Sequence, residues 1–150
     1  MKKIKTKFFE TDSLTLANGE TFGPVTLAYE THGELNEAGD NAILIFHALT
    51  GSHHVAGVTP EVPTLGDRWN AACQIGWWDD FVGPGKAIDT DRFFVICANY
   101  FGGCYGSTGP SSINPKTDKP YGGSFPHIQF SDIVDSQIPL LDHLGIEKLH

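Results

Sequence analysis

A short turn after a buried strand holds the residues whose types and spacing best suit chemistry. The letters HALTG at residues 47–51 follow the continuous apolar run AILIF at 42–46, which predicts a strand buried on both faces. A rigid backbone N–H at the end of such a strand can stabilise the negative charge that grows on an acyl carbonyl oxygen during nucleophilic attack. For this pentapeptide alone, an ordinary turn with a packed histidine is an equal alternative.

Two other short patterns are similar to a nucleophile turn but lack its context. GGCYG at 102–106 follows a second apolar run at 93–98 and would make Cys104 the nucleophile. The next letters, STGP, continue as a loop, whereas such a turn needs a helix directly behind it. We therefore expect Cys104 to be a packed small residue. In GGSFP at 122–126 a proline replaces the last glycine and no strand precedes, so Ser124 is expected to be a turn residue.

Phosphate and metal sites are weaker interpretations of this sequence. The glycine-rich stretch 102–109 lacks the Lys-Ser/Thr ending of a phosphate-binding loop. His53 and His54 are adjacent and cannot easily face one ion, so we expect no metal and interpret both as solvated or pocket-edge histidines. Trp77 and Trp78 are expected to fill the core or an interface.

The composition is that of one folded domain. Its 150 residues are 40% hydrophobic, which is enough for a core, and the net charge of −8 disfavours a nucleic-acid partner. The three cysteines lack CxxC spacing, so they predict neither a disulfide framework nor a zinc site and favour a reducing compartment. No apolar run approaches the roughly 18 residues of a membrane span. We therefore expect a cytoplasmic protein with no membrane partner.

Several strands are predicted within the first hundred residues. The alternating residues 14–16 and the strand formers at 25–30 flank an Asn-Gly pair, which predicts an opening antiparallel hairpin. The runs 42–46 and 93–98 predict two strands of a mostly parallel sheet covered by helices. The long irregular crossover between these two runs is of a kind that usually carries function.

One segment near the end of the chain has clear helix signals. Ser131 as N-cap, an apolar stripe and Gly145 as C-cap predict a helix, in which Pro139 predicts a kink or an earlier end. Residues 77–82 are a weaker candidate for a short helical piece. Residues 146–150 look like the approach to another strand, so the β-α-β unit is expected to be incomplete.

Several of these segments together resemble the homoserine O-acetyltransferase family of the α/β-hydrolase superfamily. The similarity runs almost continuously from about Gly23 to the end. It includes AYETHGELN at 28–36, WWDDFVGPGKAIDTD at 77–91, NYFGGCYGSTGPSSINP at 99–115 and YGGSFP at 121–126, in the family's order and spacing.

The resemblance implies a fold and a domain boundary. The fold class is α/β: the N-terminal half of an α/β-hydrolase, with a mostly parallel sheet and an antiparallel N-terminal hairpin, ending before the turn that carries the catalytic serine. We expect residues 1–150 to be an incomplete domain, with a core from about residue 23 and an N-terminal extension at 1–12.

The same resemblance implies an activity and a set of site residues. The family transfers an acetyl group from acetyl-CoA to homoserine, in methionine biosynthesis, by a ping-pong route through an acyl-serine. Leu49 would supply a backbone N–H to the oxyanion hole, and Thr50, Gly51, Gly102 and Gly103 would line the mouth of the pocket. The serine, aspartate and histidine are expected outside this chain, so the 150 residues alone are expected to be inactive.

The resemblance further implies no cofactor beyond acetyl-CoA as co-substrate, and a homodimer for the complete protein. The sequence leaves the acyl donor and acceptor open, and a homoserine O-succinyltransferase or a serine O-acetyltransferase of the same family is the alternative to the acetyltransferase. A short, non-enzymatic binding module is the alternative from another class.

Overall fold

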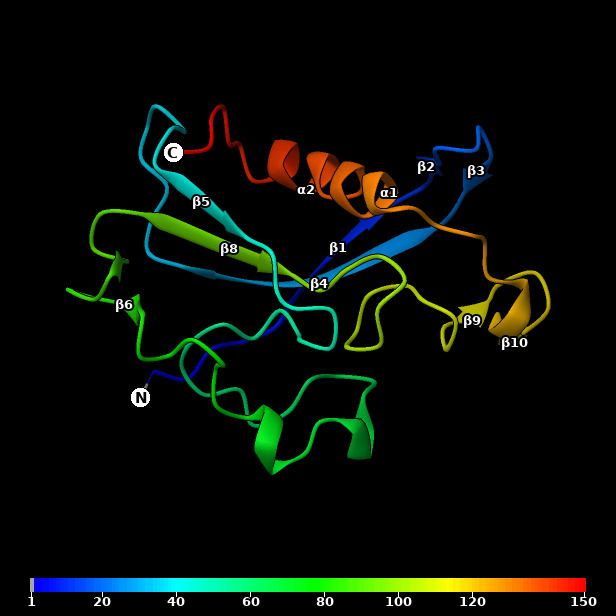
Figure 1. Cartoon of the computed structure of the whole chain (residues 1–150), viewed down its shortest axis with the longest axis horizontal. Coiled ribbons are helices and arrows are strands. Elements are labelled where there is room, and N and C mark those ends of the chain that lie inside the picture. The colour runs from blue at the N-terminus through cyan, green and yellow to red at the C-terminus, as the bar shows by residue number, and fades with distance from the viewer. Residues whose placement is uncertain (1) are drawn as a thin grey trace.

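A four-stranded mixed sheet organises the computed structural model, which describes residues 2–150. Its order is β1 (Lys7–Thr11), β4 (Val25–His32), β8 (Phe94–Ala98) and β5 (Ala42–Ile45). The strand β4 is antiparallel to both of its neighbours, β1 and β8, whereas β5 and β8 are parallel, with Leu44 opposite Ile96 (Figure 1). The carboxyl ends of β5 and β8 therefore lie at the same edge of the sheet.

The N-terminal hairpin differs from the one that the sequence predicts. β2 (Leu14–Thr15) pairs with β3 (Thr21–Phe22) around Gly19, which takes a φ of +85°. The strand at 25–30 pairs instead with β1, inside the stretch that was expected to be an extension. The Asn-Gly pair correctly predicted the turn, but the prediction that residues 14–16 pair with the strand at 25–30 was wrong. That strand pairs with β1, because the five-residue register between β1 and β4 is longer than the three alternating residues could provide.

The strand β8 is buried on both faces, as its apolar run predicts. Ile96 and Ala98 belong to a core on the helix side, together with Leu140. Val95 and Cys97 belong to a second core on the other side, with residues of the crossover such as Val55. Figure 1 shows the same division, with the helices on one side of the sheet and the crossover on the other.

The expected helix is divided into two short helices, α1 (Phe130–Asp135) and α2 (Ile138–His143). Pro139 lies in the first turn of α2, where its missing N–H costs no helical bond, so the expected earlier helix end is confirmed. The N-cap is Gln129 rather than Ser131, because Gln129 and Asp132 form a reciprocal capping box. No helix of residues 2–150 is long and apolar enough to cross a membrane.

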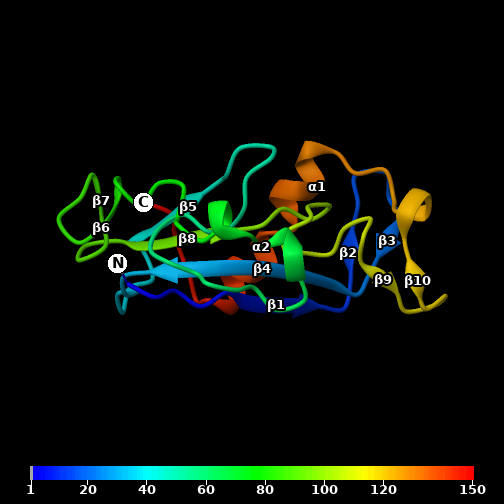
Figure 2. The ribbon, with the colours of Figure 1, turned by 90° about the horizontal axis from the view of Figure 1, so that it is seen from below.

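The connecting segments contain only short elements. The crossover contains the 3-10 turns η1 (Gly66–Arg68) and η2 (Ala71–Cys73) and the paired strands β6 (Val82–Gly83) and β7 (Ile88–Asp89); the later loop contains β9 (Ile113–Asn114), β10 (Lys119–Pro120) and η3 (Gly122–Ser124). The helix considered for 77–82 is absent: that segment is a turn leading into β6. Figures 1 and 2 place β6 at one end of the molecule, and β2, β3, β9 and β10 together at the other.

The outer side of β5 makes the first contacts of a further strand. Leu149 forms a parallel bridge with Ala42, and the His150 N–H donates to the Ala42 carbonyl at 2.8 Å. This confirms the expectation that residues 146–150 approach another strand. β5 is thus positioned between β8 and this approaching strand.

Candidate functional site

Two loops meet at the carboxyl edge of β5 and β8. One is the predicted turn at 47–51 and the other begins at Asn99, directly after β8. In open α/β sheets, the crevice at the carboxyl ends of parallel strands is the usual place for a ligand. The pairing of β5 with β8 therefore brings together residues that are about fifty positions apart in the sequence.

His47 is buried and tied to the second loop by three contacts. Its Nε2 lies 3.3 Å from the Asn99 side-chain nitrogen, its ring stacks on Tyr100 with 3.8 Å between centroids, and its carbonyl accepts from the Tyr100 hydroxyl. Desolvation by burial lowers the pKa of His47, opposed by its hydrogen bond to the Ala48 carbonyl. The packed histidine that the alternative interpretation requires is present, and it holds the turn against its neighbour.

The turn presents the Leu49 backbone N–H without an internal acceptor. Ala48 O accepts from His47 Nδ1 and from the Gly51 N–H, both at 2.7 Å, which closes the turn. No backbone carbonyl among residues 2–150 accepts from the Leu49 N–H, and the Leu49 side chain is 81% exposed. A free, rigidly held N–H of this kind is what stabilisation of an oxyanion requires.

A hollow of about 270 Å³ opens beside this turn. Thr50 and Gly51 line it together with Ala48, Ser52, Ala72, Cys73, Ile75, Trp77 and Tyr105. No lining residue carries a charge at neutral pH. Of the predicted site residues, the structure thus brings Thr50 and Gly51 to one hollow beside Leu49.

Gly102 and Gly103 do not line this hollow, and their surroundings explain why glycine is needed at both. Gly102 has a φ of +87°, and an added Cβ would lie 2.4 Å from the Ile128 side chain. An added Cβ at Gly103 would lie 2.8 Å from Asn99 Oδ1. This turn therefore supports Asn99 through close packing.

A buried carboxylate anchors the segment that follows the predicted turn. Glu30 on β4 accepts from the backbone N–H of Val55 at 2.6 Å and of Ala56 at 3.2 Å, and it contacts His32 and His54 at 2.8 Å each. Burial alone would raise the pKa of Glu30, but the hydrogen bonds and charges of the two histidines lower it to about 2. The second ring nitrogen of His54 faces the Gln74 carbonyl, so both of its nitrogens face acceptors.

The two adjacent histidines are core residues, so the expectation of solvated or pocket-edge rings is wrong. His53 and His54 are both fully buried. Desolvation lowers the pKa of His53 to about 4, and its Nδ1 has no partner among the described residues, while its Nε2 lies 2.9 Å from the Thr6 hydroxyl. This burial was not predictable from the sequence, because the partners of the two histidines, Thr6 and Glu30, lie far earlier in the chain, in the segments that contain β1 and β4.

The remaining residues that the sequence analysis considered differ in their exposure and contacts. Cys104 is exposed, which corrects the expectation that it is packed, and the segment after it is loop rather than helix. Ser124 is a turn residue whose hydroxyl donates to the Tyr121 carbonyl, as expected. Trp77 and Trp78 are each about two-fifths exposed rather than core residues, and the Trp77 indole donates to the Ser52 carbonyl beside the hollow.

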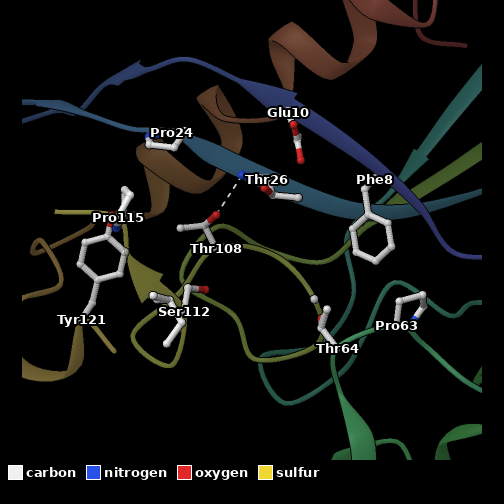
Figure 3. A pocket seen from close by; sticks show the side chains of 12 residues that line it. Phe8, Glu10, Pro24, Thr26, Pro63, Thr64, Thr108, Ser112, Pro115 and Tyr121 are labelled. Atoms are coloured by element: carbon white, nitrogen blue, oxygen red, sulfur yellow. Dashed lines mark hydrogen bonds between the residues drawn. The ribbon is translucent and has the colours of Figure 1, made fainter. Parts of the chain in front are cut away.

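A larger hollow of about 520 Å³ lies elsewhere, against β1 and β4 (Figure 3). It is lined by Phe8, Glu10, Pro24, Thr26, Pro63, Thr64, Gly106, Thr108, Ser112, Ile113, Pro115 and Tyr121. Thr108 accepts there from the Thr26 backbone N–H at 2.8 Å. None of the predicted site residues borders this hollow, although its volume is the larger of the two.

Comparison with solved structures defines the class of protein first. A homoserine O-acetyltransferase from Bacillus anthracis superposes with a TM-score of 0.83 at 39% identity, covering 100% of this chain and 39% of that chain. An esterase superposes with a TM-score of 0.82 at 40% identity, covering 97% and 39%. The fold is therefore part of an α/β-hydrolase.

Sequence comparison narrows this class to a family. No protein-family model matches the chain. A homoserine O-acetyltransferase from Carboxydothermus hydrogenoformans is 53% identical over 147 residues, which are 97% of this chain and 36% of that protein. Over nearly its whole length the chain is similar to homoserine O-acetyltransferases, and it spans little more than a third of the length of the curated relatives it matches.

Proposed function

We propose that this chain is part of a homoserine O-acetyltransferase, which transfers an acetyl group from acetyl-CoA to the hydroxyl of homoserine. The observation that carries the proposal is the Leu49 N–H after the carboxyl end of β5: its peptide carbonyl accepts two hydrogen bonds, and the N–H itself has no backbone acceptor among residues 2–150. The similarity to homoserine O-acetyltransferases and the neighbouring uncharged hollow support it. We propose that residues 1–150 form the N-terminal part of the domain that carries this activity.

The proposed reaction proceeds in two acyl transfers. A serine outside residues 1–150 attacks the thioester carbonyl while its proton passes to a histidine, which returns that proton to the sulfur as the C–S bond breaks and CoA leaves as the thiol. The homoserine hydroxyl then gives its proton to the same histidine as it attacks the acyl-serine carbonyl. The histidine passes this proton to the serine oxygen as the acyl–serine bond breaks, and O-acetylhomoserine is released. In both steps the Leu49 N–H donates to the carbonyl oxygen as that oxygen becomes negative.

The other site residues have proposed roles around this N–H. Thr50 and Gly51 contact the substrate in the hollow beside Leu49. We retain Gly102 and Gly103 as residues of the pocket mouth in the complete protein. Because the attacking serine lies outside residues 1–150, the chain alone is expected to transfer no acetyl group. The complete protein is proposed to act as a homodimer in the cytoplasm, within methionine biosynthesis.

The test uses the complete gene product that contains this chain, with acetyl-CoA and homoserine as substrates. Release of free thiol and the mass of the product ester report the reaction. Leu49→Pro removes the backbone N–H and is expected to slow turnover by about 10²–10³-fold, the usual cost of one oxyanion donor. Leu49→Ala keeps the N–H and alters only an exposed side chain, so it is the matched control and should stay within about threefold.

Equal activity of the Leu49→Pro and Leu49→Ala enzymes would contradict the proposed role of this N–H. Succinyl-CoA in place of acetyl-CoA, and serine in place of homoserine, separate the alternatives within the family. If the complete gene product transfers no acyl group to any acceptor, a binding module becomes the better explanation.

Ester hydrolysis is a second candidate, favoured by the similarity to a solved esterase. An esterase and an acyltransferase share the acyl-serine and differ in whether water or an alcohol resolves it. The ratio of acetate to acetyl ester formed at saturating homoserine therefore distinguishes them. A predominantly acetate product would assign hydrolysis.

A further inference from the structure

The peptide group that carries the Leu49 N–H is fixed from its carbonyl side. The Ala48–Leu49 bond is trans, since the one cis bond among residues 2–150 is Gly23–Pro24. In a trans peptide the C=O and N–H point in opposite directions within one plane. The two hydrogen bonds accepted by Ala48 O, from His47 Nδ1 and from the Gly51 N–H, therefore determine where the Leu49 N–H points.

The hydrogen bonds of Asn99 define which nitrogen of His47 carries the proton. Asn99 Oδ1 accepts from the Tyr105 backbone N–H at 3.1 Å, so the amide nitrogen of Asn99 is the atom that faces His47 Nε2. An amide nitrogen donates, so Nε2 must accept. The proton then resides on Nδ1, the nitrogen that faces the Ala48 carbonyl.

Asn99 is itself held in one orientation. Its backbone N–H donates to the Ala28 carbonyl at 2.7 Å, and its carbonyl accepts from the Ser107 hydroxyl at 2.6 Å. Gly103 leaves room for its side chain, since an added Cβ there would approach Asn99 Oδ1 too closely. The side chain is almost completely buried, so no water competes for its amide.

We propose that His47 and Asn99 are positioning residues for the oxyanion N–H: Asn99 holds His47 as the Nδ1–H tautomer, and His47 holds the Ala48 carbonyl so that the Leu49 N–H faces the reacting acyl group. This inference rests on the function proposed above. Hydrogen bonds accepted by a peptide carbonyl also polarise its N–H, which strengthens that donor. The burial that lowers the pKa of His47 favours the neutral ring that the arrangement needs.

The test compares two substitutions of His47 in the complete gene product. His47→Phe keeps a ring to stack on Tyr100 but removes the donor to Ala48 O. His47→Asn offers a side-chain nitrogen near the position of Nδ1 and restores that donor. We expect His47→Phe to lower kcat and kcat/KM for acetyl-CoA by the same factor, about 10²-fold, because the interaction is made in the transition state. His47→Asn should recover at least about tenfold of that loss.

Two controls separate positioning from loss of folded protein. Rates are expressed per acylated serine, titrated with p-nitrophenyl acetate, so that misfolded molecules do not count. His143→Phe, at an exposed position on α2, is the matched ring substitution and is expected to leave kcat unchanged. In addition, ¹⁵N spectra of the histidine rings should report His47 as the Nδ1–H tautomer, and Asn99→Leu should abolish that preference.

The outcomes distinguish this inference from the function on which it rests. If Leu49→Pro is inactive while His47→Phe and His47→Asn turn over equally, the oxyanion role stands and the positioning role is wrong. If Leu49→Pro is fully active, the proposed function itself fails. An Nε2–H tautomer of His47 in the unmodified protein would also overturn the positioning inference.

Discussion

Removal of the buried carboxylate of Glu30 tests whether this group anchors the segment after the turn at 47–51. In Glu30→Leu, the N–H groups of Val55 and Ala56 and the facing nitrogens of His32 and His54 lose their acceptor. Breaking a buried ion pair by removing one partner costs about 3–5 kcal/mol. Every 1.4 kcal/mol corresponds to about a tenfold change in an opening equilibrium, so the local opening of this segment should become roughly 10²- to 4 × 10³-fold more frequent.

Hydrogen exchange followed by mass spectrometry measures this opening directly in the complete gene product. A peptide covering 52–59 should exchange faster in Glu30→Leu, while a peptide covering β8 serves as the reference for the sheet. Glu30→Gln is the matched control, because its side-chain oxygen still accepts from Val55 and Ala56 and its amide nitrogen can donate to a neutral His54. Equal exchange of the 52–59 peptide in the Leu and Gln variants would refute the role of this carboxylate as an anchor.

The charge of Glu30 adds a dependence on pH. Its pKa is lowered from 4.5 to about 2 in the folded protein, which corresponds to roughly 3 kcal/mol of stability. Because the folded-state pKa is the lower one, this stability is present above pH 4.5 and is lost as the pH falls toward 2. Glu30→Gln should remove the loss in that window, as measured by urea unfolding at a series of pH values.

Three further predictions concern other parts of the chain. The pKa of His53 is lowered from 6.5 to about 4 in the folded protein, so between these pH values the unfolded state gains a proton that the folded state does not, and stability falls with pH. His53→Phe should therefore make the urea-unfolding midpoint less dependent on pH between 6.5 and 4. An unchanged slope of the midpoint against pH would contradict this. Gly102→Ala should destabilise the protein by about 1 kcal/mol more than Gly19→Ala, because the two glycines have similar positive φ angles but only an alanine at 102 would displace a neighbouring side chain, that of Ile128. Equal melting temperatures would show that packing is not the cause. The isolated 1–150 chain should associate and bind a hydrophobic dye, since it leaves apolar surface and a sheet edge open, and a sharp, concentration-independent melt of a monomer would disprove this.

The buried strands and the turn after the first of them were predictable because their signals are local. A continuous apolar run such as 93–98 predicts a buried strand without knowledge of its neighbours, and the structure places it between two cores. A proline inside an apolar helix pattern is equally local, and it correctly indicated the break between α1 and α2. The turn at 47–51 followed from the same kind of signal, its place directly after a buried strand, whereas the choice of Leu49 within it rested on the family resemblance.

The residues that support the turn were not predictable in the same way. Glu30 stands at the end of the strand formers at 25–30, where a charged residue usually marks a wet face. Its burial depends on His54 and on two backbone N–H groups that approach from the crossover. Asn99 gave a weak signal, as a polar residue immediately after a buried strand, but its partner His47 is 52 positions away. Such pairs become visible only when the parallel register of β5 and β8 is known.

The segment from 47 to 56 is fixed near its two ends by different side chains, and the exposed residues between these ends are 48–50. At one end, Asn99 and Tyr100 hold His47; at the other, Glu30 holds Val55 and Ala56. A donor for a transient negative charge must be in place before the charge appears, because reorganisation during the reaction would consume the benefit. Loosening either end should therefore disturb the exposed middle, so that Glu30→Leu is expected to lower kcat even though Glu30 borders no part of the hollow. If the Glu30→Leu enzyme opens at 52–59 as predicted but keeps its kcat per acylated serine, His47 and Asn99 alone would account for the position of the Leu49 N–H.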